Sequence, residues 1–218
     1  MSSIGRCFLC EKDFTKRGIT RHLSTCIKKK LTPGEREMLH ISIESIDFPE
    51  YWIHILVYTK TTFRTLDNFL RDIWCECCGH LSGFWIDKPF GTARIGKRSK
   101  IGEILMPKMK FFYVYDFGTS TILLLKVHDM YQVSTKNRII LLARNYPPEI
   151  KCKCGNPAKY VCSICYIEDP ENAFLCEKCK KEHQCEEEAL LPVVNSPRMG
   201  LCGYEGSRLV NVFELYKY

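Results

Sequence analysis

The chain has 218 residues, of which 45% are hydrophobic and 26% are charged, and its formal net charge is +7 at pH 7. This composition is typical of a globular protein and excludes a collagen, a coiled coil and a disordered chain. No stretch approaches the roughly 18 uninterrupted apolar residues of a membrane helix, and the N-terminus lacks the apolar segment of a signal peptide. We therefore expect a cytoplasmic protein without a membrane partner.

The 14 cysteines are the unusual feature of the composition. Most of them occur in pairs of the C-x2-C type, with histidines nearby. In a reducing compartment this arrangement favours metal ligation over disulfide bonds. Because the hydrophobic content is sufficient for a core, we expect zinc to fold small modules rather than the whole molecule.

The positive charge lies in two segments. Residues 1–30 contain eight Lys or Arg against two acidic residues, and residues 91–150 contain ten against four. The segments 31–90 and 151–190 are acidic. Basic segments of this kind are compatible with a nucleic-acid surface, and ordinary solvated lysines explain residues 91–150 equally well.

The first 30 residues carry a zinc-finger pattern. The candidate ligands are Cys7, Cys10, His22 and Cys26, with the spacing C-x2-C-x11-H-x3-C. Two cysteines on a tight turn and two ligands four residues apart on a helix form the tetrahedral set that zinc prefers. The segment resembles a single CCHC-type finger over residues 5 to 28.

Basic residues of this finger are candidates for contacts with nucleic acid. They are Lys16, Arg17, Arg21, Lys28, Lys29 and Lys30. Contacts with phosphates give affinity without sequence information. Gly18 occupies the central base-reading position of a finger helix and has no side chain, so we expect weak sequence specificity. Docking of the finger on a protein or on the neighbouring domain is an equally good hypothesis.

The segment 35–150 has mixed helical and strand patterns and predicts an α+β core. Thr32, Pro33 and Gly34 before it predict a linker or turn. Aromatic and β-branched runs predict strands over residues 51–58, 84–86, 111–115, 121–128 and 138–143, with a hairpin around Gly118. A helix is expected from an N-cap at Thr65 to about Trp74. His40, His54 and His128 lie in apolar or strand contexts, so we expect them to be structural.

The run WCECCGHLS, residues 74–82, is the most distinctive part of this core. Cys77, Cys78 and His80 are candidates for a further metal site or for a nucleophile with its base. A helix end with buried cysteines is favoured, because three ligands within four residues need another donor to surround an ion. Cys202 is an additional candidate ligand.

Residues 152–185 contain eight further candidate ligands. They form the pairs Cys152 and Cys154, Cys162 and Cys165, Cys176 and Cys179, and His183 and Cys185. Their order resembles the cross-braced fingers of the HIT, MYND and B-box kind. The resemblance implies that the first and third pairs share one zinc ion and that the second and fourth share another. The tight spacing of the first pair leaves open that Cys202 replaces one of its members.

Four runs resemble one known family. They are WCECCGHLS at residues 74–82, YVYDFG at 113–118, LLARN at 141–145 and LPVVNSPRMG at 191–200. Together they resemble the plasmid Ri open-reading-frame-3-like family, described as a TnpR-like passenger protein of an insertion element, over about residues 50–205. The resemblance implies an α+β domain and a mobile-element context, without a defined activity. Thr119 and Thr121 stand where many relatives carry Asp and Trp.

These patterns predict an α+β core over residues 35–150, flanked by a finger over 1–30 and a double-zinc module over 151–190. Residues 191–218 are expected to pack on the core. We expect three zinc ions and a non-enzymatic protein that contacts nucleic acid through the finger and a protein partner through 151–190. One alternative is an adaptor whose two zinc modules both bind protein. The other is an enzyme that uses Cys77 or Cys78 with His80 and Asp116.

Overall fold

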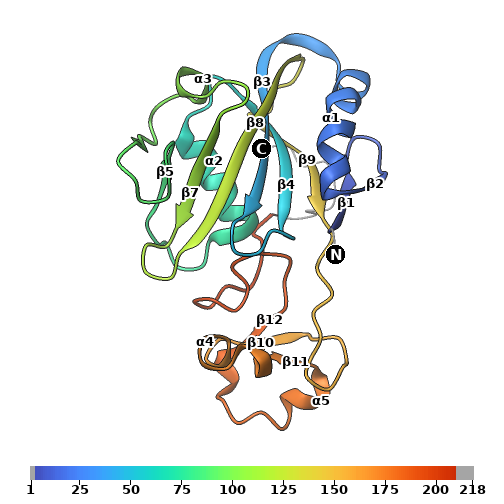
Figure 1. Ribbon diagram of the computed structural model, residues 1–218, viewed down its shortest axis with the longest axis vertical. Helices are drawn as coiled ribbons and strands as arrows, with labels where there is room; N and C mark the ends of the chain where they lie inside the picture. Colours follow the sequence, from blue (N-terminus) through green and yellow to red (C-terminus); the bar gives the residue numbers. More distant parts are fainter. Residues whose placement is uncertain (1–2, 210–218) are drawn as a thin grey trace.

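A computed structural model describes residues 3–209 of the chain (Figure 1). The protein is a mixed α/β structure that consists mostly of antiparallel sheet. A large sheet has nine strands in the order β2-β1-β9-β4-β3-β8-β7-β5-β6, and a small sheet has three strands in the order β11-β10-β12. The small sheet lies at one end of the molecule, below the large sheet in Figure 1.

The strands of the large sheet are β1 (Ile4–Cys7), β2 (Asp13–Thr15), β3 (Pro33–Ser45), β4 (Trp52–Tyr58), β5 (Ser82–Trp85), β6 (Arg94–Ile95), β7 (Lys110–Tyr115), β8 (Thr121–Val133) and β9 (Ile139–Asn145). The small sheet contains β10 (Tyr160–Cys162), β11 (Phe174–Leu175) and β12 (Leu190–Pro192). The helices are α1 (Lys16–Lys30), α2 (Phe63–Leu70), α3 (Ile101–Ile104), α4 (Cys165–Glu168) and α5 (Glu177–Lys180). A π-helical turn, Arg71–Cys75, continues α2, and short 3-10 turns cover Pro170–Asn172 and Glu187–Ala189.

The main core lies between the large sheet and α2. Leu66, Phe69 and Leu70 of α2 and Ile73 of the following turn are fully buried, as expected from their helical spacing. They pack against the alternating apolar residues of the central strands, such as Ile55 of β4. Period-two alternation along these strands directs one set of side chains to this core and the other set to the opposite face.

Helix α1 covers part of the opposite face. Its buried residues Ile19, Leu23 and Ile27 join a second apolar cluster with Trp52 of β4 and Leu142 of β9. The helix lies beside β9 and β1 at one side of the sheet (Figure 1). On this face, Ile122, Leu124 and Lys126 of β8 and Phe112 of β7 are half-buried and Lys110 is exposed, so solvent reaches this part of the sheet.

The finger is joined to the core through the backbone. Strand β1 pairs with β2 of the finger on one side and with β9 of the core on the other, with Cys7 opposite Ala143. The indole nitrogen of Trp52 also donates a 2.7 Å hydrogen bond to the hydroxyl of Ser3. The N-terminal segment therefore forms part of the large sheet and is not a separate module joined to it by a flexible linker.

Two local predictions are wrong. Pro33 and Gly34 begin the long strand β3, and a Cβ atom at Gly34 would collide with the backbone of Ser134, so the glycine permits a close approach rather than a turn. Helix α2 begins at Phe63, with Thr62 as the N-cap residue, not at Thr65. The predicted hairpin around Gly118 is correct, because β7 and β8 pair directly from Lys110 to Tyr115.

The chain after β12 returns to the main core. Ser196 donates a 2.7 Å hydrogen bond to the carbonyl of Trp74, and the buried Arg198 pairs with Asp116 at 2.7 Å. Tyr204 is buried, and the backbone NH of Arg208 donates to the carbonyl of Asp72. Packing on the core was predicted for residues 191–218, and positions 210–218 lie outside the described residues. No helix within residues 3–209 is long and apolar enough to cross a membrane.

Candidate metal centres and a basic groove

Four groups of Cys and His side chains occur within residues 3–209, each with four ligand atoms that lie within 4.8 Å of one another. They are Cys7, Cys10, His22 and Cys26; Cys77, Cys78, His80 and Cys202; Cys152, Cys154, Cys176 and Cys179; and Cys162, Cys165, His183 and Cys185. Every cysteine of the chain except Cys75 belongs to one of them. Sets of four thiolates, or of three thiolates and one imidazole, are typical of structural zinc.

The distances between ligand atoms match tetrahedral zinc. Zinc–sulfur bonds of about 2.3 Å at tetrahedral angles separate two sulfur atoms by roughly 3.8 Å. The Sγ–Sγ distances are 3.9 Å for Cys7 and Cys26, 3.6 Å for Cys154 and Cys176, and 3.7 Å for Cys165 and Cys185. A disulfide bond requires about 2.05 Å instead. The groups therefore have room for a metal ion and not the geometry of disulfides.

In the finger, the ligands come from β1, the turn after it and α1. Thr15 caps α1 by accepting a hydrogen bond from the backbone NH of Gly18, which fixes the start of the helix that carries His22 and Cys26. The ring of Phe14 stacks on His22 with centroids 3.9 Å apart. Burial, together with the neighbouring thiols, raises the pKa of Cys26 to about 12. A cation offsets the cost of gathering these thiols as thiolates.

The module over residues 152–192 brings its ligand pairs together in the cross-braced order. The first and third pairs form one group and the second and fourth form the other. Both Cys152 and Cys154 belong to the first group, because a tight turn at Gly155, with a φ of 87°, reverses the chain directly after them. Cys202 is absent from this group. The module has its own small apolar cluster around Val161 and Leu191.

The fourth group combines the run after the π-helical turn with Cys202. The Sγ atoms of Cys77 and Cys78 lie 3.8 Å apart, and that of Cys78 lies 3.5 Å from that of Cys202. His80 Nε2 lies 3.0 Å from Cys78 Sγ and 3.1 Å from Cys202 Sγ. The sequence favoured buried cysteines here, but Cys78 and Cys202 are exposed and Cys202 supplies the missing donor. Of the three cysteines in the run 74–82, only Cys75, which lies outside all four groups, is fully buried in the apolar core.

The residues of the enzyme hypothesis also meet at this place. His80 Nε2 lies 3.5 Å from an oxygen of Asp116, which is itself paired with Arg198. Burial opposes ionisation of Asp116, and hydrogen bonds from Arg198 and from the backbone of Gly118 outweigh it, so its pKa is lowered. A carboxylate held in this way keeps its negative charge and is poorly suited to accept a proton from His80.

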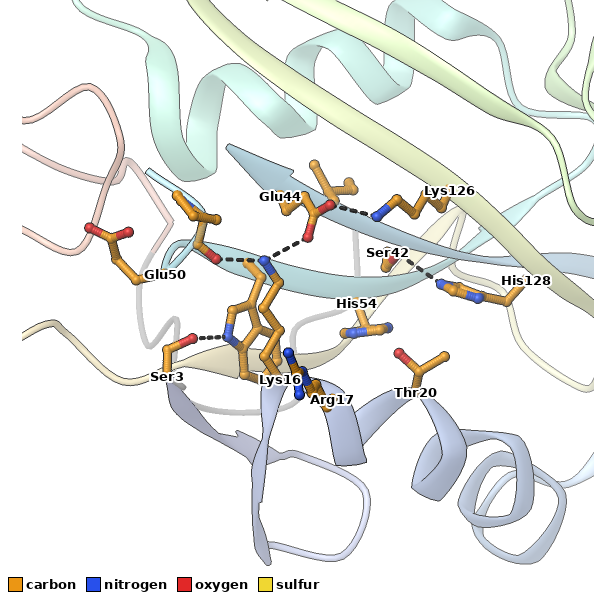
Figure 2. Close-up of a pocket in the computed structure, with 13 residues that line it drawn as sticks. Ser3, Lys16, Arg17, Thr20, Ser42, Glu44, Glu50, His54, Lys126 and His128 are labelled. Atoms are coloured by element: carbon orange, nitrogen blue, oxygen red, sulfur yellow. Dashed lines mark hydrogen bonds and ion pairs between the residues drawn. The ribbon is translucent and has the colours of Figure 1, made fainter. Parts of the chain in front are cut away.

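A groove of about 770 Å³ lies between α1 and the sheet (Figure 2). Its lining residues are Ser3, Lys16, Arg17, Thr20, Ser42, Ile43, Glu44, Pro49, Glu50, Trp52, His54, Lys126 and His128. Lys16 and Lys126 each lie 2.6 Å from Glu44, and Lys16 also donates to the carbonyl of Pro49. Burial opposes ionisation of Glu44, but the hydrogen bonds from the two lysines outweigh it and lower its pKa.

The three histidines outside the metal groups form one cluster, in which His54 and His128 line this groove and the buried His40 contacts both of them. His40 Nε2 and His54 Nδ1 are 2.9 Å apart, and His128 Nε2 lies 2.7 Å from the hydroxyl of Ser42. Burial, assisted by the nearby His128, lowers the pKa of His40 to about 3, and burial also lowers the pKa values of His54 and His128. All three are therefore neutral at pH 7. The sequence predicted them to be structural and did not predict that they form one cluster.

Strand register places basic and aromatic side chains beside this groove. Residues paired directly across antiparallel strands have their side chains on the same face. One such row runs across the sheet through Arg94, Trp85, Phe112, Leu124, Glu44 and Trp52. The next row contains Lys110, Lys126, Ser42 and His54. Both rows lie on the face opposite α2, which we call the open face.

The open face ends in an aromatic cluster in which Phe90 and Phe117 are exposed and pack against the buried Trp85. The rings of Phe90 and Phe117 lie 5.5 and 5.9 Å from that of Trp85, and the Arg94 guanidinium lies 5.4 Å from the Trp85 ring. Phe90 is 51% exposed. Such an arrangement of exposed rings beside basic groups was not visible in the sequence, because it depends on strand pairing.

The predicted phosphate-binding residues of the finger differ in their exposure to solvent. Arg17, Arg21, Lys28, Lys29 and Lys30 are exposed on α1. Lys16 is half-buried and occupied by its ion pair with Glu44. The first turn of α1 lines the groove, so it faces the sheet instead of projecting away from the molecule (Figure 2).

Comparisons with known proteins identify no family. No protein-family model matches the chain, and no curated protein matches it. One solved structure that matches is a protein of unknown function, MM3350, from Methanosarcina mazei Go1, with 18% sequence identity and a TM-score of 0.41. The match covers 47% of this chain and 65% of that chain. The resemblance to the plasmid Ri family therefore stays a prediction.

Proposed function

We propose that the protein binds single-stranded nucleic acid along the open face of its large sheet, with α1 as a basic wall and with zinc ions as structural supports. The observation that carries this proposal is that the open face combines the exposed cations Arg94 and Lys110 with the exposed rings of Phe90 and Phe117. Grooves that bind single strands combine cationic groups for the phosphates with aromatic rings on which bases stack.

The charges beside the open face support an anionic ligand. Arg17 and Arg21 are exposed one helical turn apart on α1, and Lys110 is exposed on β7. The acidic Glu44 is already neutralised by Lys16 and Lys126. A polyanion that enters along α1 thus meets cations whose charge is not cancelled by Glu44.

A single strand fits better than a duplex. A finger that reads duplex DNA places the first turns of its helix in the major groove, whereas the first turn of α1 faces the sheet. Stacking on Phe90 and Phe117 requires bases with accessible faces, which a duplex hides inside its stack. Gly18 offers no base-reading side chain, in keeping with weak sequence preference.

A binding assay tests this proposal. Labelled single-stranded DNA, single-stranded RNA and duplex DNA of several sequences are titrated with the zinc-loaded protein at low salt, and fluorescence anisotropy is measured. We expect the single strands to bind more tightly than the duplex. Phe90→Ala is expected to weaken binding by about 1–3 kcal/mol, the worth of one stacked base. Phe48→Ala, another exposed phenylalanine outside the open face, is the control.

A second candidate function is protein binding by the zinc module. Ile164 and Ile167, one helical turn apart, are 44% and 73% exposed, and neighbouring exposed apolar side chains are suited to a protein interface. If no nucleic acid binds at low salt, the adaptor hypothesis takes precedence. The double variant Ile164→Ser and Ile167→Ser, used in a pull-down from the native host, then tests the module as the docking surface.

A further inference from the structure

We infer that Cys77, Cys78, His80 and Cys202 bind a fourth zinc ion, and that this ion clamps the C-terminal segment, residues 195–209, onto the core. The inference does not depend on nucleic-acid binding. It adds one ion to the three that the sequence predicts, and it gives this ion a role different from that of a finger. Where the other three groups join ligands over at most a few tens of residues, this group joins ligands that are 122 and 124 residues apart.

The donor set specifies the metal. Three thiols and one imidazole form a tetrahedral site that suits zinc and excludes hard cations such as Mg²⁺ or Ca²⁺, which prefer oxygen. The sulfur separations of 3.8 and 3.5 Å are those of two thiolates on one tetrahedral ion and are much longer than a disulfide bond.

The surroundings of the group favour a negatively charged metal complex. Zinc with three thiolates and a neutral imidazole carries a net charge of −1. The guanidinium of Arg198 lies 3.6 Å from Cys77 Sγ, and the phenol of Tyr115 lies 3.7 Å from the same atom. Hydrogen bonds and positive charge directed at a ligating sulfur stabilise its thiolate form.

The backbone at Cys202 is an independent observation. Its φ is 49°, in the left-handed region that residues other than glycine seldom adopt, and Gly200 and Gly203 on either side have φ values of 80° and 66°. An exposed cysteine has no apolar packing to hold this conformation. A bond from its sulfur to a metal ion supplies the constraint that the rest of the loop lacks.

The segment that the metal ion would clamp already packs on the core on both sides of Cys202. Ser196 and Arg198 are fixed before Cys202 by Trp74 and Asp116, and Tyr204 is buried after it. Cys202 lies between these two anchors. A metal ion bound to it would link the C-terminal segment to Cys77, Cys78 and His80, which directly follow the π-helical turn. Without the ion, Cys202 and Gly203, the exposed part of this turn, are held by no side-chain contact of comparable strength.

Native mass spectrometry and limited proteolysis test the clamp. The wild-type protein, purified with a mild reductant and zinc, is expected to carry four ions. Cys202→Ser is expected to carry three and to be cleaved within residues 195–209 faster than the wild type, by tenfold or more. Cys75→Ala, which removes a cysteine outside all four groups, is the matched control and is expected to keep four ions. Cys78→Ser, at an exposed position, provides a second ligand variant in case one of the two folds poorly.

Two results would overturn the inference. If the wild-type protein carries three ions and Cys202→Ser also carries three, the fourth site does not exist. Loss of one ion in Cys202→Ser without faster cleavage of the C-terminal segment would show that the ion does not clamp it.

Discussion

Cys7 lies opposite Ala143 in the ladder between β1 and β9, so the first zinc ligand of the finger is also a residue of the central sheet. From the sequence we expected zinc to fold small modules rather than the whole molecule. The pairing of β1 with β9 and the packing of α1 on Trp52 and Leu142 couple the finger to the core. Metal in the finger is therefore expected to stabilise the core as well.

Loss of zinc from the finger should unfold part of the core. We expect Cys26→Ser to release α1 and expose Ile19, Leu23 and Ile27, whose burial contributes about 1.5–3 kcal/mol each. The free energy of unfolding should fall on the order of 5 kcal/mol. Urea denaturation followed by tryptophan fluorescence measures this change selectively, because all three tryptophans, Trp52, Trp74 and Trp85, belong to the core.

The module supplies the control for this experiment. Cys179→Ser removes a ligand from a group that has its own sheet and its own apolar cluster. The tryptophan-monitored stability should change little, while the module itself becomes sensitive to protease. If Cys26→Ser and Cys179→Ser lower core stability equally, the coupling is not specific to the finger.

Gly5→Ala separates docking of the finger from binding of its zinc. A Cβ atom at Gly5 would collide with the carbonyl oxygen of Arg144 on β9, so the variant has to open the ladder between β1 and β9. All four ligands of the finger remain. We expect an unchanged zinc content by native mass spectrometry and a lower free energy of unfolding, by roughly 1–3 kcal/mol for a forced backbone shift. An unchanged stability would mean that this ladder contributes little.

The buried pair of Asp116 and Arg198 offers a test of the C-terminal packing. Arg198 is fully buried and its guanidinium lies 2.7 Å from Asp116. Asp116→Asn keeps the size of the side chain and tolerates the left-handed φ of 64°, but leaves Arg198 without its counter-charge. Breaking a buried pair on one side costs about 3–5 kcal/mol, which a denaturation curve detects. In Asp116→Asn with Arg198→Met, which removes both charges, most of that loss should be recovered.

The features that could be predicted from the sequence are those formed by residues close together in the chain. The groups Cys7 to Cys26 and Cys152 to Cys185 are assembled by turns and helix spacing within short segments, so their spacing predicts them. Strands such as β4 and β9 are recognised by their aromatic and β-branched residues. These features depend on near neighbours in the chain.

The fourth metal group and the open face depend on contacts between distant segments. No local sequence pattern relates Cys78 to Cys202. The one indication in the sequence was that Cys202 lies outside the paired cysteines and was therefore free to act as a ligand elsewhere. Strand β3 was not predicted. Its first residues, Pro33 and Gly34, are typical turn residues, whereas pairing with β8 and β4 makes the segment a central strand of the sheet. The row from Arg94 to Trp52 likewise exists only through the register of the sheet.

The histidine cluster predicts loss of stability in acid. His40 has a pKa of about 3 in the folded protein, well below about 6.5 in an unfolded chain. Above pH 6.5 the histidine is neutral in both states and has no effect; as the pH falls, the unfolded state binds the proton first and is favoured. The cost for His40 is about 1.4 kcal/mol at pH 5.5. Urea denaturation at saturating zinc should show a smaller acid loss in His40→Gln than in the wild type, by about that amount.

Salt dependence separates nucleic-acid binding from protein binding. Each phosphate contact on a single strand changes the slope of log affinity against log salt by about −0.7. With Arg17, Arg21, Lys28 and Lys110 engaged, we expect a slope between roughly −2 and −4. Arg17→Ala with Arg21→Ala should flatten it by about 1.4, because two contacts are lost.

The matched control for the arginine pair is Lys178→Ala with Lys181→Ala, which removes two exposed charges from the zinc module and leaves α1 intact. This variant has the same net charge as the arginine pair variant, so a general loss of positive charge would flatten both slopes equally. The proposed site requires that only the arginine pair flattens the slope and that neither variant changes the zinc content. Equal slopes in the two variants would place the phosphate contacts away from α1, and the proposed role of α1 as a basic wall would then be wrong.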